Sequence, residues 1–140
     1  MGGRVPHGAG RTGAPALLQI SLPLLLHPFA TNAGLIASGP FNLGQRDDFR
    51  VPDVGYHRTK PVGVWHATAA IVVEIVSPDD ETYAKFDFYL ARGVEEIIVV
   101  DPAEKSVRCF LRTGSSFTDS GTSLLLGVDA TYVTAGIDWP

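Results

Sequence analysis

The sequence has little cysteine and no excess of basic residues, and both shortages limit the classes of protein to which it can belong. Cys109 is the only cysteine, so no disulfide can form within the chain and nothing indicates an oxidising compartment. The 11 lysines and arginines are outnumbered by 15 acids, which leaves a formal charge of −4. This balance argues against tight, nonspecific polyanion binding by the monomer. We therefore expect a cytoplasmic protein in which any contact with nucleic acid depends on a local basic patch.

Long apolar runs are also missing. The longest apolar-rich stretch, Ala16–Leu26, is interrupted by Gln19, Ser21 and Pro23 and is too short to span a bilayer of about 30 Å, so no membrane segment is expected. The glycine-rich stretch Met1–Pro15 has almost no large apolar side chains and is expected to be disordered. The remaining residues, 16–140, suit a single domain that buries its own core.

The first half of this domain predicts one helix followed by strands. Apolar residues without acids predict a buried helix over Leu17–Leu35, kinked at Pro23 and Pro28. Short apolar runs between turn residues then predict an antiparallel meander of strands. The expected strands are Ala37–Leu43, Val51–His57 and Ile71–Val76.

The second half predicts a strand-helix-strand unit and thus a mixed sheet. Ser77 and Pro78 suit the N-cap and first position of a helix that runs to Arg92 and ends at Gly93. The β-branched run Ile97–Val100 is typical of a strand buried on both faces after a helical crossover. Further strands are expected over Ser106–Arg112, Leu124–Leu126 and Thr131–Val133.

One carboxylate interrupts the most apolar strand. Glu74 stands within Ile71–Val76, where an ionised carboxylate costs several kcal/mol unless a metal ion, a cation or strong donors meet it. Asp53 lies on a neighbouring strand, and two facing carboxylates repel unless a cation lies between them. Hard oxygen ligands favour Mg²⁺ or Mn²⁺. Asp53 and Glu74 are therefore the candidate metal ligands.

Lys85 can return to the level of Glu74. The strand rises roughly 7 Å from Glu74 to Val76, and seven residues of the following helix descend roughly 10 Å. A metal ion at this place would activate water and polarise a phosphoryl oxygen, while Lys85 would orient the water or stabilise developing charge. The residues thus predict metal-dependent phosphodiester hydrolysis, with Asp53, Glu74 and Lys85 as the catalytic set.

With these residues the sequence resembles the Uma-two (Uma2) family of restriction-endonuclease-like proteins within the PD-(D/E)XK nuclease superfamily. The resemblance covers roughly Leu35 to Asp138 and is carried by Arg50–Val54, Ile71–Pro78, Lys85 with Tyr89, and Gly93–Pro102. It implies an α/β (α+β) fold with a mixed central β-sheet flanked by helices, an αβββαβ-type core, and Mg²⁺-dependent cleavage of DNA.

The resemblance also assigns roles to single residues. Asp53 matches the aspartate of the superfamily motif and Glu74 its second acid. The lysine usually found two residues after that acid is absent, because Val76 stands there, and Lys85 from the following helix matches its replacement in this family. The first helix has no acid, and His27 or Gln19 could fill that position.

Smaller assignments follow from the same stretch. Tyr89 is expected to pack against the site or to hydrogen bond to it. Asp101 is expected to be a turn acid, and Glu95 and Glu96 are expected to begin a strand at the surface. The basic residues Arg46, Arg50, Arg58 and Lys60 surround the Asp53 strand and are either a local basic track or a solvated rim.

Other hypotheses stay open beside an endonuclease that acts on DNA. Glu74 and Lys85 could form an ion pair that only orders the fold, in which case the chain would be a catalytically degenerate member serving as a homodimeric interaction module. Arg4 and Arg11 ahead of Leu17–Leu26 imitate a signal peptide, which leaves a secreted binder of small ligands as a third hypothesis.

Overall fold

The structure is a computed structural model that describes residues 14–79 and 81–140. The expected disorder of residues 1–15 therefore falls outside the described residues, except that Ala14 and Pro15 form the start of helix α1 (Ala14–Asn32). This helix replaces the predicted one over Leu17–Leu35 and runs through Pro23 and Pro28 without ending. None of the helices in the described ranges is long and apolar enough to cross a membrane.

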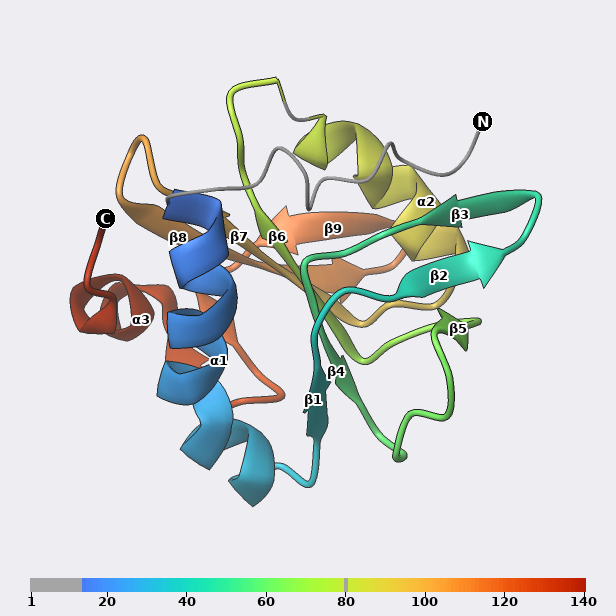
Figure 1. Cartoon of the computed structure of the whole chain (residues 1–140), viewed down its shortest axis with the longest axis horizontal. Helices are drawn as coiled ribbons and strands as arrows, with labels where there is room; N and C mark the ends of the chain where they lie inside the picture. The colour runs from blue at the N-terminus through green and yellow to red at the C-terminus, as the bar shows by residue number, and fades with distance from the viewer. Residues whose placement is uncertain (1–13, 80) are drawn as a thin grey trace.

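A mixed six-stranded sheet forms the centre of the molecule, with strand order β1-β4-β6-β7-β8-β9 (Figure 1). Its strands are β1 (Ile36–Ser38), β4 (Val54–His57), β6 (Ile71–Ile75), β7 (Glu96–Asp101), β8 (Ser106–Thr113) and β9 (Ser116–Asp119). The pair β6·β7 is parallel and the other neighbouring pairs are antiparallel. This confirms the predicted mixed sheet, the meander that ends at β6 and the αβββαβ-type core.

A smaller sheet, β3-β2-β5, was not predicted. The expected strand Ala37–Leu43 is divided at Gly39 and Pro40 into β1 and β2 (Asn42–Gln45), since proline has no N–H to donate to a neighbouring strand. Strand β2 pairs with β3 (Asp48–Arg50) in a hairpin and with β5 (Trp65–His66) in parallel.

Two apolar cores lie on opposite faces of the central sheet. Helices α1 and α3 (Ala130–Gly136) cover one face, and the 3₁₀ helix η1 (Thr82–Lys85) with α2 (Phe86–Ala91) covers the other (Figure 1). The α1-side core takes Ile71, Val73 and Ile75 from β6, whereas the α2-side core takes Val72. Because side chains alternate along a strand, Glu74 faces the α2 side.

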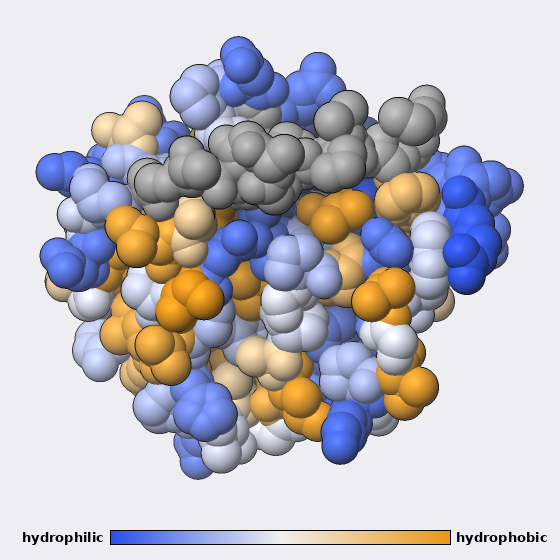
Figure 2. All heavy atoms as spheres, in the orientation of Figure 1, coloured by the Kyte–Doolittle hydropathy of each residue, from blue (hydrophilic) through white to orange (hydrophobic). Residues whose placement is uncertain are grey.

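Helix α1 buries one stripe and exposes another. Leu18, Leu22, Leu26 and Ala30 are buried at four-residue spacing against the α1-side core. Leu17, Ile20 and Leu24 are 60%, 66% and 71% exposed on the outer side. In Figure 2 apolar atoms accordingly gather on the face of the molecule that carries α1.

The two predicted late strands are wrong. Leu124–Leu126 lies in the turn between β10 (Thr122–Ser123) and β11 (Val128–Asp129), and Thr131–Val133 belongs to α3. Helix α3 forms because Ala130, Val133 and Ile137, at helical spacing, are buried in the α1-side core.

The predicted surface position of Glu96 is also wrong. Its side chain is buried and accepts hydrogen bonds from Ser123 Oγ at 2.6 Å and from the backbone N–H of Leu125 at 2.8 Å. These donors supply the compensation that a buried carboxylate requires.

The cysteine Cys109 lies buried on β8. Burial is the main cause, and the nearby Glu96 the second, that raises the pKa of its thiol to about 12, so the thiol stays protonated at neutral pH.

Candidate metal and catalytic site

Asp53 lies in the bend immediately before β4, and Glu74 lies in β6, the neighbour of β4 in the sheet. Val54 pairs with Val73, so continuing this antiparallel register by one residue sets Asp53 opposite Glu74. Val54, the first residue of β4, faces the α1-side core, whereas Glu74 of β6 faces the α2 side. Asp53 Oδ2 accepts a hydrogen bond from the backbone N–H of Ile75 at 2.7 Å, so the aspartate carboxylate lies beside β6.

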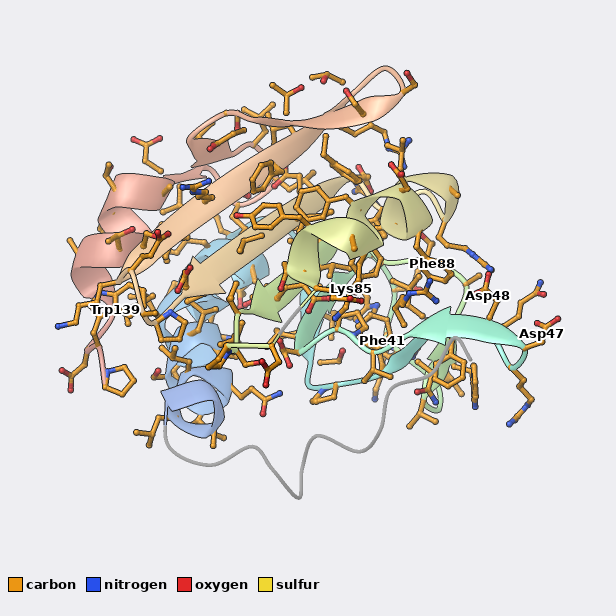
Figure 3. All side chains as sticks on the ribbon, turned by 90° about the horizontal axis from the view of Figure 1, so that it is seen from above. Phe41, Asp47, Asp48, Lys85, Phe88 and Trp139 are labelled. Carbon is orange, nitrogen blue, oxygen red and sulfur yellow. The ribbon has the colours of Figure 1, made fainter. Side chains whose placement is uncertain are left out.

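Glu74 receives donors from the helical segment above it. Lys85 Nζ lies 3.2 Å from Glu74 Oε1, and the Tyr89 hydroxyl donates to Glu74 Oε2. Glu74 is fully buried, and Asp53 and Lys85 are only 3% and 7% exposed. Figure 3 shows Lys85 on the helical segment formed by η1 and α2, close to the middle of the molecule. The structure thus brings Lys85 to Glu74 as predicted, and Tyr89 both packs and hydrogen bonds there.

The path that carries Lys85 to this place differs from the predicted one. Ser77 and Pro78 lie outside any helix, and Ser77 therefore caps none. Helical structure begins only at Thr82, as a 3₁₀ turn that passes into α2 at Phe86. The predicted end of the helix is close to correct, because α2 ends at Ala91 and Gly93 has the positive φ, +82°, that suits glycine after a helix.

Gln19 and His27, the two candidates for the acid that the first helix lacks, differ in their position relative to Asp53. Gln19 Nε2 donates to the backbone carbonyl of Asp53 at 3.4 Å, so Gln19 borders the acid. His27 is exposed, and its Nε2 lies 3.4 Å from Thr31 Oγ1 on the next turn of α1. Of the two, Gln19 is the one that the structure brings to the Asp53 strand.

The expected basic cluster is in part paired with carboxylates. Arg50 lies 3.1 Å from Asp48, and Arg58 lies 2.6 Å from Glu95. Both pairs are partly solvent-exposed, where such pairs contribute little to stability. This arrangement fits the solvated rim better than a continuous basic track.

A cavity of about 280 Å³ lies apart from the acid pair. Its lining includes His57, His66, Thr68 and Arg58, and neither Asp53 nor Glu74 lines it. Burial and the neighbouring His66 lower the pKa of His57, whose Nε2 lies 2.8 Å from Ser38 Oγ. The charged residues of its lining, Arg58 and Glu95, are paired with each other.

The carboxylate oxygens of Asp53 and Glu74 are ligands of the kind that magnesium takes in proteins. Residues 14–79 and 81–140 contain no group of three or more His, Cys, Asp or Glu side chains able to hold a metal ion. Magnesium does not need one, since it is commonly held by one or two carboxylates and several waters. Each carboxylate oxygen can accept about two hydrogen bonds or ligands, so Glu74 can keep Lys85 and Tyr89 while it offers a lone pair to an ion.

Tyr89→Phe is expected to lower the free energy of unfolding by about 1–3 kcal/mol, because the buried Glu74 carboxylate loses a hydroxyl donor. Urea denaturation followed by circular dichroism measures the change. Tyr83→Phe is the control, since Tyr83 is 51% exposed and should change the midpoint little. Equal midpoints for the two variants would show that the hydroxyl of Tyr89 adds nothing to the fold.

The fold and the sequence both have known relatives. The structure is similar to the crystal structure of a "putative nuclease belonging to DUF820" from Anabaena variabilis, with a TM-score of 0.68 and 13% identity over 90% of this chain and 83% of that one. No curated protein matches the sequence. The sequence profile of the Uma2 family, described as "putative restriction endonuclease", matches residues 6–128. This match covers most of the chain, which therefore belongs to the Uma2 family.

Proposed function

We propose that the chain is a Mg²⁺- or Mn²⁺-dependent endonuclease that hydrolyses phosphodiester bonds in DNA. The observation that carries the proposal is the contact of 3.2 Å between Lys85 Nζ and Glu74 Oε1, one residue along β6 from Ile75, whose backbone N–H donates to Asp53 Oδ2. Membership of a family described as "putative restriction endonuclease" supports the same class of reaction.

Each residue has a part in the proposed reaction. Asp53 and Glu74 would hold the ion through their carboxylate oxygens, and the bound ion would supply Lewis acidity to a water and to a phosphoryl oxygen. Lys85 would stabilise the negative charge that grows as water oxygen bonds to phosphorus and the bond from phosphorus to the leaving oxygen breaks. Tyr89 would fix the orientation of the Glu74 carboxylate through its hydrogen bond.

A second function is favoured by the burial of the same residues. Glu74 is fully buried with a cation at one oxygen and a hydroxyl at the other, which is also how a structural ion pair is satisfied. A protein that used the pair only in this way would be a degenerate member of the family, acting as a homodimeric interaction module.

The deciding experiment compares wild type with Glu74→Ala. Supercoiled plasmid DNA is expected to be nicked by wild type in Mg²⁺ or Mn²⁺ and not by Glu74→Ala, and calorimetry is expected to detect Mn²⁺ binding to wild type alone. Asp119→Ala is the matched control, because Asp119 is an exposed acid at the far edge strand β9. A folded wild type that neither binds Mn²⁺ nor cleaves DNA above the Glu74→Ala background would favour the interaction module.

A further inference from the structure

One buried polar side chain of the helical segment that carries Lys85 has no hydrogen-bond partner among the described residues. Thr82 is 2% exposed, and its Oγ1 makes no hydrogen bond in the part of the chain that the structure describes. A buried hydroxyl without a partner costs free energy, and such groups are rare in folded proteins unless they have a use. Nothing in the sequence distinguished this threonine, since its feature is the absence of a bond.

The helical geometry sets Thr82 beside Lys85. In a 3₁₀ helix side chains three residues apart lie one above the other, separated by about 6 Å along the axis. Thr82 and Lys85 are the first and last residues of η1 and its only buried ones, whereas Tyr83 between them is half exposed. Both therefore face the sheet, on the side where Glu74 lies.

Tyr89 continues the same line of buried polar groups into α2. Tyr89 is fully buried and bonds to Glu74, as Lys85 does. Three polar side chains of this segment are thus buried between it and the sheet. Two of them bond to the Glu74 carboxylate, and the third, Thr82, has a buried O–H donor one 3₁₀ turn before Lys85.

We infer that Thr82 Oγ1 donates a hydrogen bond to a nonbridging phosphate oxygen of the substrate bound at Lys85. A neutral hydroxyl next to an ammonium group suits such an oxygen, because the cation attracts the charge and the hydroxyl fixes the direction of the bond. Thr82 is then a substrate-binding residue of the site. This inference rests on the proposed endonuclease function.

The test replaces Thr82 by valine, which keeps the shape and removes the hydroxyl. The urea midpoint of Thr82→Val is expected to equal or exceed that of wild type, since an unpartnered buried group is lost. Single-turnover cleavage of DNA is expected to fall about 10- to 100-fold, the loss typical of a hydrogen bond to a charged group. Thr82→Ser, which restores the hydroxyl, is expected to recover most of the rate.

Binding separates this inference from the proposed function. In Ca²⁺, which is expected to support binding without cleavage, Thr82→Val should bind a short DNA duplex more weakly than wild type does. If wild type cleaves no DNA, the proposed function fails. If wild type and Thr82→Val then also bind the DNA duplex with equal affinity, the role of Thr82 is overturned as well. Cleavage by Thr82→Val within twofold of wild type would overturn it directly. A urea midpoint that is lower for Thr82→Val than for wild type and is restored in Thr82→Ser would also overturn the role of Thr82, because the hydroxyl would then form a hydrogen bond within the folded protein.

Discussion

Lys85→Met is expected to slow DNA cleavage by about 10² to 10³-fold, the loss typical of one preorganised group that stabilises developing charge. Methionine keeps the length and the apolar stem of the side chain and removes the ammonium group that lies 3.2 Å from Glu74 Oε1. Initial rates of plasmid nicking in Mg²⁺ measure the effect, at protein concentrations corrected for the folded fraction.

The control for this experiment is Lys105→Met, because Lys105 is exposed in the turn between β7 and β8. Its rate should equal that of wild type. A rate for Lys85→Met that matches the control would remove Lys85 from the chemistry and leave it a structural role only.

The second large effect concerns stability. Glu74→Gln and Lys85→Met are each expected to lower the free energy of unfolding by about 3–5 kcal/mol, because each removes one charge from a buried ion pair. The double variant is expected to regain much of this loss, since both charges of the pair are then gone.

Guanidinium denaturation of wild type, both single variants and the double variant gives the coupling free energy of the pair. Arg58 and Glu95 provide a matched reference cycle, because they form a shorter contact of 2.6 Å that is exposed to solvent and should couple much less strongly. If the losses of Glu74→Gln and Lys85→Met simply add in the double variant, the two side chains do not depend on each other for stability.

The central sheet and the acid pair could be predicted because their signals are local. A strand buried on both faces is a continuous apolar run, and a single carboxylate within it, Glu74, is visible without any knowledge of its neighbours. The neighbouring position of Asp53 needed only the meander, which the pairing of β4 with β6 confirms, although β4 begins at Val54, later than the predicted strand Val51–His57, and leaves Asp53 in the bend before it.

The helix after β6 shows where local signals fail. Ser77 and Pro78 have the composition of a helix start, yet the helical segment begins at Thr82. Burial of Thr82 and Lys85 and the bonds from Lys85 and Tyr89 to Glu74 fix this segment instead. Such tertiary contacts override a capping preference that is worth about 1 kcal/mol. Lys85 therefore reaches the predicted place by a different path.

The errors near the C-terminal end have a non-local cause as well. Glu96 is buried because its donors come from distant parts of the chain, Ser123 of β10 and Leu125 of the turn after it, 27 and 29 residues away. Thr131 and Val133 have β-branched side chains that favour strands, but packing of α3 against α1 decides in favour of a helix. No pattern within the segment itself contains this information.

The division of the apolar residues between two faces of the sheet sets an order for folding during synthesis. The α2-side core draws all its buried residues from Phe41 to Phe110, so it can form once that stretch has left the ribosome. The α1-side core joins Leu18 to Ile137 and must wait for nearly the last residues. Until then the buried stripe of α1 can pack on β1, β4 and β6, but the part of this core that α3 covers stays open to solvent.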